Sequence, residues 1–301
     1  MSLRTKMLVW IGTPLVVIFL AMSIFVYWDA SNRITEGTRR EMEALAQFHA
    51  EEINRIVDSK TGLLDGLVQA WTTGFPDNAR FIQIAEEFAK RKDIAYLYAG
   101  FPDRDFVTNG DGVIPRSEFD ATTRGWYKSA AAKDGIQISQ VYDDAISNKK
   151  VVTLSRALKA NGRLTGVAAI DVMFSVIEDK VLSIRVGDHG EAFLLDDQGR
   201  FIAHAHLKMD DNIQAQGEEN ARRFLSKEPI FFESRYMDTD YCYAVHPVGD
   251  TGWNLVLFVP KDEVLADVAH LKWTMLIGSI ISLLLLGAIL FMTAQSIAGP
   301  I

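Results

Sequence analysis

Two apolar runs without a charged residue, at residues 7–28 and 273–293, stand near opposite ends of this 301-residue chain. About 20 apolar residues suffice for a helix to cross the hydrocarbon core of a bilayer. A cleaved signal peptide is the alternative for the first run, but its apolar region normally has only about 7–15 residues. The first run is longer and ends in Tyr27 and Trp28, and aromatic residues gather at membrane interfaces. The sequence therefore predicts two transmembrane helices that bracket one large segment.

Positively charged residues set the expected orientation. Arg4 and Lys6 precede the first run, and cytoplasmic flanks are rich in such residues. We therefore expect residues 1–6 to be cytoplasmic and residues 29–272 to lie outside the inner (cell) membrane, in the periplasm or the extracellular space. The tail after the second run, residues 295–301, resembles the opening of a HAMP linker. A cytoplasmic output module is therefore expected beyond Ile301.

Composition and motifs exclude several classes of protein. The net charge is −8 and the pI is about 5.3, whereas nucleic-acid-binding surfaces are normally basic. Cys242 is the only cysteine, so no intrachain disulfide can form. Residues 103–112 are acidic but lack the spacing of a calcium loop, and the histidines lack a zinc-like spacing. With no nucleophile motif or phosphate-binding loop, we expect no enzyme, no metal and no cofactor.

A long helical pattern follows the first apolar run. Its apolar residues recur at intervals of three and four, with His49 and Lys60 at the two remaining positions of the stripe: Met42, Leu45, Ile53, Ile56, Leu63, Leu67 and Trp71. This period predicts an amphipathic stalk helix over residues 29–75. The helix either packs only along its own domain or also pairs with a copy of itself. Both can hold, and we expect a homodimer.

Strand-like runs separated by turns fill the rest of the outer segment. They form two blocks, which predicts two small α+β modules in series, at residues 76–185 and 186–260. The expected strands are residues 94–101, 105–109, 135–142, 149–158, 164–172, 191–197, 200–207, 231–237, 241–248 and 253–260. A hairpin turn is expected at residues 159–163 and a helix at residues 172–184. Residues 261–294 are expected to continue as a helix into the second membrane run.

The stretch from residue 119 to residue 130 carries the most informative chemistry. Asp120 and the threonines after it can cap a helix, which would place Arg124, Trp126 and Tyr127 in its first two turns. The planar guanidinium fork fits a carboxylate through two hydrogen bonds. In the alternative interpretation, Arg124 pairs with a structural acid while the two aromatic side chains fill the core.

At these residues the chain resembles double-Cache (dCache_1) sensor domains, which occur in bacterial methyl-accepting chemotaxis proteins and related transmembrane sensors. The resemblance covers about residues 30–270. It rests on the two apolar runs, the long first helix, the two strand-rich blocks and the R-x-W-Y motif at residues 124–127, and residues 190–207 look like the family's second module. It implies an α+β fold in which a long N-terminal helix and two tandem PAS-like (Cache) modules are flanked by two transmembrane helices.

One subgroup of this family binds amino acids, and the resemblance carries its motif over residue by residue. Arg124 and Trp126 match the residues that hold the ligand carboxylate. Tyr127 matches a residue near the ligand amine, and Tyr142 matches the next aromatic residue. The membrane-distal module, residues 76–185, is then expected to bind the ligand.

The same resemblance assigns the ligand ammonium to Asp171, with Asp144 as a possible second acid. A zwitterion needs a cation at one end and an anion at the other, so this pairing is chemically consistent. The alternative for Asp171 is that it only caps a helix beginning at Val172. Tyr96 and Tyr98 share one face of their strand, and either line the pocket or pack in the core.

The sequence also departs from the subgroup. Phe119 stands where the subgroup has Tyr, so one hydroxyl is lost. A proline that the subgroup has nearby is also missing here, since Ala121 follows Asp120. The departure leaves open another small carboxylate or an amine-bearing ligand.

The expected function is that of the extracytoplasmic part of a chemoreceptor. It would bind a small amino acid or related carboxylate in the membrane-distal module and signal through the second transmembrane helix. The alternatives are the sensor region of a histidine kinase or a diguanylate cyclase, and a module that binds a periplasmic partner protein instead of a small molecule. The expected partners are the ligand, the membrane and a second copy of the chain, with no nucleic acid.

Overall fold

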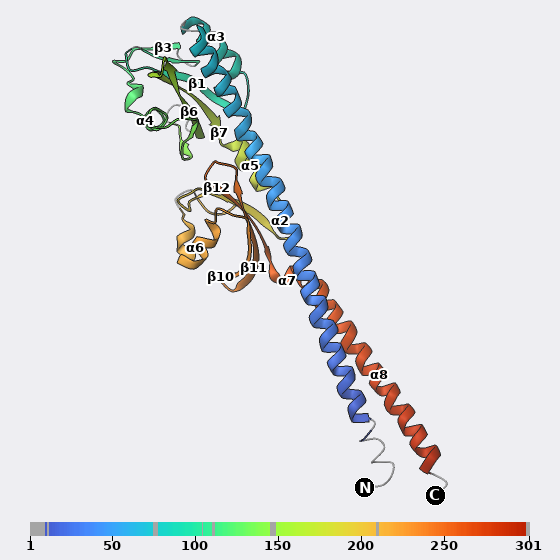
Figure 1. The fold of residues 1–301 in the computed structure, drawn as a ribbon. Coiled ribbons are helices and arrows are strands. Elements are labelled where there is room, and N and C mark those ends of the chain that lie inside the picture. Colours follow the sequence, from blue (N-terminus) through green and yellow to red (C-terminus); the bar gives the residue numbers. More distant parts are fainter. Residues whose placement is uncertain are drawn as a thin grey trace.

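The computed structural model describes residue 10 and residues 12–74, 78–103, 105–109, 112–144, 149–208 and 211–298. One long helix runs along the side of two stacked sheets, and a second helix leaves the lower sheet beside it (Figure 1). The expected cytoplasmic N-terminus, residues 1–6, and the last three residues of the expected HAMP-like tail lie outside the described residues. The architecture is therefore mixed helix and sheet with a long N-terminal helix, as predicted.

Helix α2 (Thr13–Gly74) joins the first apolar run and the predicted stalk in one 62-residue helix. Its most buried side chains are Met42, Ala46, Ala50, Ile53, Val57 and Leu64. The predicted stripe residues Leu45, Ile56, Leu63 and Trp71 lie at the edge of this seam and are only partly buried. The buried face of the helix is thus rotated from the predicted stripe. It includes the small residues Ala46 and Ala50, and strands of both sheets pack against the helix.

The two polar residues in the predicted stripe have partners. Lys60 is buried and its ammonium pairs with Asp93, just before the first strand. His49 Nδ1 lies 2.9 Å from Glu52 Oε2, and Glu52 also pairs with Lys180 at 2.7 Å. These contacts attach the helix to the first sheet and its flanking helix.

The first sheet has seven antiparallel strands in the order β3-β2-β1-β7-β6-β4, with β5 paired to β6. The strands are β1 Ile94–Gly100, β2 Phe106–Thr108, β3 Gly112–Ile114, β4 Gln137–Ile138, β5 Tyr142–Asp143, β6 Lys150–Ala160 and β7 Arg163–Met173. Helices α3 (Asn78–Ala89), α4 (Gly125–Ala132) and α5 (Ser175–Ser183) flank it, and together these elements are called the first module.

Two details of the first sheet differ from the sequence prediction. β3 was not predicted, and the single strand expected at residues 135–142 is divided into β4 and β5. Between them the Ser139 hydroxyl oxygen accepts a hydrogen bond from the Thr153 N–H at 2.9 Å, so a side chain replaces a backbone acceptor there. The predicted hairpin turn is confirmed, because Asn161 and Gly162 both have positive φ, as a two-residue turn between right-twisted strands requires.

The second sheet has five antiparallel strands in the order β10-β11-β12-β8-β9. They are β8 Glu191–Leu195, β9 Phe201–Ala203, β10 Ile230–Tyr236, β11 Thr239–Val248 and β12 Trp253–Pro260. With helix α6 (Glu218–Phe224) they form what is called the second module. β9 ends before His204, earlier than predicted.

Each sheet buries one face against α2, and a single hydrophobic core joins α2 with both modules. The opposite faces differ. That of the second sheet is filled by packed aromatic rings, including Phe193, Phe224 and Phe232. That of the first sheet carries a smaller cluster around Tyr98 and Tyr127, which leaves room for a cavity.

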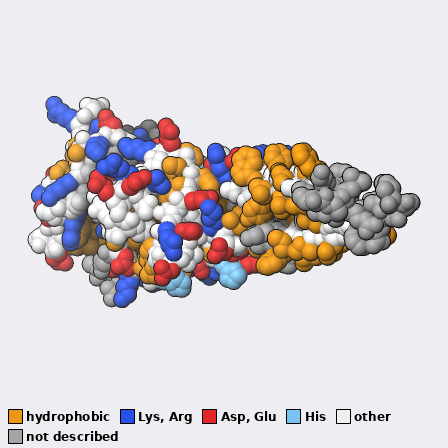
Figure 2. Space-filling view, turned by 90° about the horizontal axis from the view of Figure 1, so that it is seen from below, with side chains coloured by type: hydrophobic (Ala, Val, Ile, Leu, Met, Phe, Trp, Pro, Cys, Tyr) orange, Lys and Arg blue, Asp and Glu red, His pale blue; other side chains and the backbone are white. Residues whose placement is uncertain are grey.

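Helices α7 (Lys261–Val264) and α8 (Ala266–Ala298) follow β12. α8 packs on the N-terminal part of α2, where the Ser23 and Ser279 hydroxyl oxygens are 3.2 Å apart. Hydrophobic side chains cover the paired helices, whereas charged side chains cover the modules (Figure 2). Within the described residues, one helical stretch, Thr13–Trp71, is long and apolar enough to span a membrane, and Trp273–Ile289 is a shorter apolar segment. Both predicted membrane spans therefore stay predictions.

Candidate ligand-binding site

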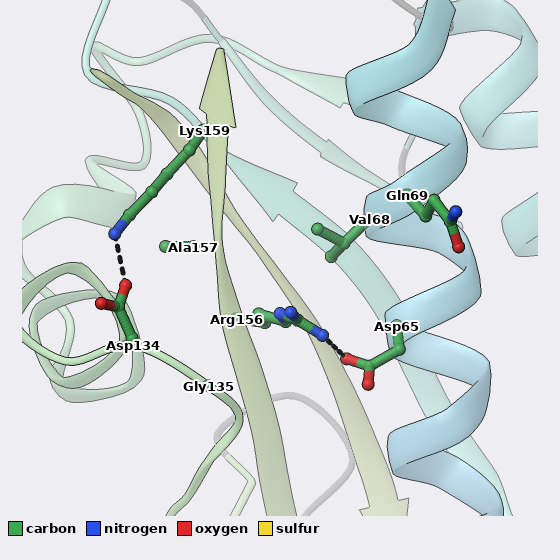
Figure 3. Close-up of a pocket in the computed structure, with 8 residues that line it drawn as sticks. All are labelled: Asp65, Val68, Gln69, Asp134, Gly135, Arg156, Ala157 and Lys159. Carbon is green, nitrogen blue, oxygen red and sulfur yellow. Dashed lines mark hydrogen bonds and ion pairs between the residues drawn. The ribbon is translucent and has the colours of Figure 1, made fainter. Parts of the chain in front are cut away.

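A cavity of about 550 Å³ lies between α2 and β6, but its charged groups are already paired. Figure 3 shows Arg156 of β6 pointing at Asp65 of α2, and Lys159 pointing at Asp134 in the loop after α4. These ion pairs hold β6 between the long helix and that loop. The hollow is therefore interpreted as a structural seam that fixes the position of β6.

A larger cavity, of about 950 Å³, opens on the face of the first sheet that is turned away from α2. Its wall combines aromatic, hydroxyl and charged side chains. Most come from the first module: Tyr96, Tyr98, Phe106, Thr108, Ile114, Phe119, Arg124, Trp126, Ser129, Gln137, Ser139, Tyr142, Asp143, Asp144, Thr153, Ser155 and Asp171. A mostly apolar hollow with a few convergent polar groups is the usual form of a small-molecule site.

Asp171 lies at the centre of a row of side chains that crosses three strands. In the sheet register it stands opposite Thr153 of β6 and Tyr96 of β1, and directly opposed residues present their side chains on the same face. Its Oδ1 accepts hydrogen bonds from the Thr153 hydroxyl at 2.6 Å and from the Tyr98 hydroxyl at 2.8 Å. No hydrogen bond joins Oδ2 to any described residue, so the carboxylate presents this oxygen to the cavity that it lines.

Burial controls the charge of this carboxylate. Loss of water raises the pKa of Asp171 to about 6, the two hydroxyl hydrogen bonds act in the lowering direction, and nearby Asp144 raises the pKa further. The group is therefore mostly ionised at pH 7 and is costly to keep charged without a cationic partner. The predicted alternative that Asp171 caps a helix is wrong, because Asp171 lies inside β7 and α5 begins four residues later, at Ser175.

Arg124 is placed by a local structure that differs from the predicted one. Asp120 does cap a helix, accepting from Thr122 N at 3.0 Å, but that element is the short 3-10 turn η2 (Ala121–Thr123). Arg124 follows in extended conformation, directly before α4. The prediction that it lies within the first two turns of a helix is therefore wrong, because the turn ends before it.

The Arg124 guanidinium lines the cavity and has no carboxylate partner among the described residues. Its carbon Cζ lies 4.6 Å from the centre of the Phe119 ring, a cation–π distance. Phe119 itself packs on Phe106, with ring centres 4.6 Å apart. The alternative in which Arg124 pairs with a structural acid is not supported by these contacts.

Trp126 and Tyr127, adjacent in α4, have different positions. Trp126 lines the cavity and packs edge-on against Tyr98 with ring centres 5.0 Å apart. Tyr127 is buried and is not among the residues that line the cavity. This position does not favour its predicted contact with a ligand amine, which stays a prediction. Both rings pack against β1 at Gly100, where an added Cβ would be 3.0 Å from Trp126 and 3.4 Å from Tyr127. Adjacent residues of a helix point in different directions, so only Trp126 also lines the cavity.

The remaining predicted residues, Tyr98, Tyr142 and Asp144, all line the cavity. The Tyr142 hydroxyl lies 2.8 Å from Thr153 Oγ1 and so extends the network that ends at Asp171. Burial first, then the neighbouring Asp171 charge, raise the pKa of Tyr142 to about 12, which keeps it a neutral donor. Asp144 is buried at the end of β5.

Two residues that line the cavity, Thr153 and Arg200, were not predicted from the sequence. Thr153 was read only as a strand residue, and its role depends on the register between β6 and β7. Arg200 also lines the cavity although it precedes β9 of the second module. No spacing in the sequence indicates that a residue from the second module reaches the site of the first.

The chain is similar to known proteins over most of its length. A family model described as Cache domain (dCache_1) matches residues 27–268. A probable methyl-accepting chemotaxis protein of Bacillus thuringiensis is 25% identical over 315 residues, which cover 100% of this chain and 45% of that protein. The methyl-accepting chemotaxis protein McpC of Bacillus subtilis is 22% identical, with 100% and 46% covered. The chain thus spans about half the length of these curated relatives.

Solved structures with the same fold include chemoreceptor ligand-binding domains. The domain of Pseudomonas fluorescens CtaA in complex with L-serine has a TM-score of 0.64 at 21% identity, and the match covers 76% of this chain and 99% of that one. The domain of Pseudomonas aeruginosa PctC in complex with GABA has a TM-score of 0.63 at 22% identity, with 74% and 99% covered. These likenesses establish the fold.

Proposed function

This chain belongs to the dCache_1 family of Cache domains, and from that premise we propose that it is the extracytoplasmic sensing part of a transmembrane chemoreceptor. In this proposal the first module binds a small amino acid. The signal then passes through α8, with α2 and α8 as the two membrane-spanning helices. The relatives that support the output are methyl-accepting chemotaxis proteins.

The observation that carries the ligand assignment is the pairing of Arg124 and Asp171 in one cavity. Arg124 offers an unpaired guanidinium fork, and Asp171 offers Oδ2 of a buried carboxylate whose other oxygen is already held. A zwitterion places its carboxylate at the first and its ammonium at the second. Each end of the ligand then contacts a group of opposite charge. A charge-assisted hydrogen bond to the buried Asp171 contributes about 1.5–3 kcal/mol, whereas solvent weakens the contact with the exposed Arg124.

The ligands of related structures are consistent with this class. L-serine in CtaA, GABA in PctC and isoleucine in Campylobacter jejuni Tlp3 each combine one carboxylate with one amine. The hydroxyl network of Tyr98, Thr153 and Tyr142 orients the Asp171 carboxylate for the amine in our proposal. Trp126 and Phe119 form an apolar wall for the rest of the ligand.

A continuous route leads from the site towards the membrane. Asp171 lies near the end of β7, which continues into α5 and then into the turn before β8. Glu263 of α7 accepts hydrogen bonds from the Asp188 N–H at 2.6 Å and the His189 N–H at 3.1 Å in that turn. α7 continues directly into α8. A ligand that prefers one arrangement of β7 would thereby bias the position of α8, which is the requirement for signalling.

Titration calorimetry of the full chain in lipid nanodiscs, against panels of amino acids and of organic acids, tests the proposal. We expect at least one amino acid to bind, and Arg124→Ala to weaken that binding by about tenfold to a hundredfold, because it removes a charged hydrogen-bonding group. Arg235→Ala is the matched control, since Arg235 is an exposed arginine of β10 outside the cavity. A panel without any binding would contradict the proposal and favour a periplasmic partner protein.

A further inference from the structure

We propose that Arg200 of the second module belongs to the ligand site and donates a hydrogen bond to an uncharged oxygen at the far end of the ligand. The preferred ligand would then be an amino acid with a neutral polar side chain. This inference rests on the proposed function and adds the side-chain class. It also makes the site a composite of both modules.

The position of Arg200 carries the first step. Arg200 follows the turn after β8 and lines the cavity of the first module. Its Nε donates to Asp196 Oδ2 at 2.7 Å, and Asp196 Oδ1 accepts from the backbone N–H groups of Gln198 and Arg200, each at 2.9 Å. The turn and the guanidinium are therefore fixed to each other, so Arg200 is held in a defined orientation at the edge of the cavity.

An unsatisfied donor supplies the second step. Arg200 Nη2 is buried and has no hydrogen-bond partner among the described residues. A buried donor without a partner costs about 1–3 kcal/mol, and native structures leave few such groups. Tyr127 also has a buried, unpartnered hydroxyl, but Tyr127 lies outside the cavity. Among the described residues, Arg200 therefore combines a buried donor that lacks a partner with a position on the wall of this cavity.

The charges around the cavity decide which oxygen suits Arg200. Asp143, Asp144 and Asp171 line the cavity with Arg124, and the charge of Arg200 is already balanced by Asp196. A second ligand carboxylate would add repulsion from these acids without meeting a free cation. An amide or hydroxyl oxygen satisfies Nη2 without that penalty. The preferred ligand class is therefore neutral and polar.

A matched pair of ligands isolates this contact. L-asparagine and L-leucine have nearly the same side-chain shape, but only asparagine carries an acceptor oxygen. We expect the asparagine-to-leucine affinity ratio of the full chain in nanodiscs to fall by about tenfold in Arg200→Ala, as for one hydrogen bond to a charged group. Arg235→Ala is the control and should leave the ratio unchanged, and L-aspartate should bind no more tightly than L-asparagine to the unmodified chain.

A second variant covers the case in which Arg200→Ala leaves Asp196 unpaired and the module unfolds. Arg200→Lys keeps the charge next to Asp196 but loses the guanidinium fork, so it should also lose the preference. In the unmodified chain, asparagine should slow hydrogen exchange in residues 196–200 more than leucine does. An unchanged ratio in Arg200→Lys, equal protection by both ligands, or tighter binding of aspartate would overturn the inference. Failure of every amino acid to bind would instead overturn the proposed function beneath it.

Discussion

The Tyr98 hydroxyl donates to Asp171 Oδ1 at 2.8 Å, although the two residues are 73 positions apart in the chain. Thr153 donates to the same oxygen, so both protein donors converge on one side of the carboxylate. The other oxygen, Oδ2, is left for the cavity. This asymmetry makes Asp171 an oriented and partly desolvated acceptor for an ammonium group.

Asp171→Asn should stabilise the ligand-free protein at pH 8. The folded-state pKa is about 6, against an ordinary value of 3.8, so the folded chain holds this proton more tightly than the unfolded chain does. The free energy of unfolding therefore falls by roughly 3 kcal/mol as pH rises from about 4 to about 6, the interval between the two pKa values. The Asn amide keeps the Oδ1 acceptor but not the charge, and we expect Tm to rise by about 6–12 °C, at about 2–4 °C per kcal/mol for a folded region of this size.

Thermal unfolding of the full chain checks this prediction, with Asp179→Asn as the control. Asp179 is an exposed residue of α5, so its substitution should leave Tm within about 1 °C. A lower Tm for Asp171→Asn than for the unmodified chain at pH 8 would show that the buried charge is not destabilising.

Ligand binding should weaken as pH falls through about 6. Below that pH the folded protein protonates Asp171, whose folded-state pKa is about 6, and an ammonium must displace the proton. Affinity is therefore expected to drop by up to about tenfold per pH unit. Calorimetry between pH 5 and pH 8 measures the slope. The slope should vanish in Asp171→Asn, and a persisting slope would assign the titration to another group.

Phe119→Tyr should strengthen binding of the ligand carboxylate. The Phe119 ring lies against the Arg124 guanidinium and lines the cavity, so a hydroxyl there adds a donor beside the cation. One added hydrogen bond corresponds to a gain of about twofold to tenfold in affinity. Calorimetry with the same amino acid is the measurement, and Phe48→Tyr, an exposed position on α2, is the control. Weaker binding would mean that the ring edge is needed as an apolar wall.

Glu263→Ala should leave ligand affinity unchanged but uncouple the modules from α8. Glu263 holds the turn before β8 through the Asp188 and His189 N–H groups, and its Oε2 also lies 3.1 Å from His189 Nδ1. Glu263→Ala removes all three contacts. Cysteines at Ser23 and Ser279, whose hydroxyls are 3.2 Å apart, report on the α2–α8 contact through their cross-linking rate in a Cys242→Ala background. Ligand should change this rate in the parent and in the control Asp262→Ala, but not in Glu263→Ala. An equal ligand response in all three would exclude this route.

The fold was largely predictable because periodicity and turn chemistry act locally. The apolar period of α2, the Asn161–Gly162 turn and the apolar run of β12 each identify their element from neighbouring residues alone. Which face of α2 is buried was harder to predict from the sequence. Ala46 and Ala50 are buried because strands approach the helix closely there, and not because alanine is strongly hydrophobic.

The candidate site was only partly predictable because it depends on register and rotation. A bulge in the β6–β7 ladder near Leu158 shifts the pairing. Counting from the turn without this bulge would place Ile170, not Asp171, opposite Thr153. Tyr127 was assigned to the ligand from the family motif at residues 124–127, yet its ring is buried in the core. Arg200 reaches the cavity only through the stacking of two modules, which no local pattern encodes.

The most direct test of the central claim removes one charge at a time from both ligand and protein. L-leucine, isopentylamine (no carboxylate) and 4-methylpentanoate (no ammonium) share one side chain and can be titrated into the full chain, Arg124→Ala and Asp171→Asn. We predict that Arg124→Ala removes the preference for leucine over the amine, and that Asp171→Asn removes the preference for leucine over the acid. Preferences that persist unchanged in both variants would show that Arg124 and Asp171 do not hold the two ends of the ligand.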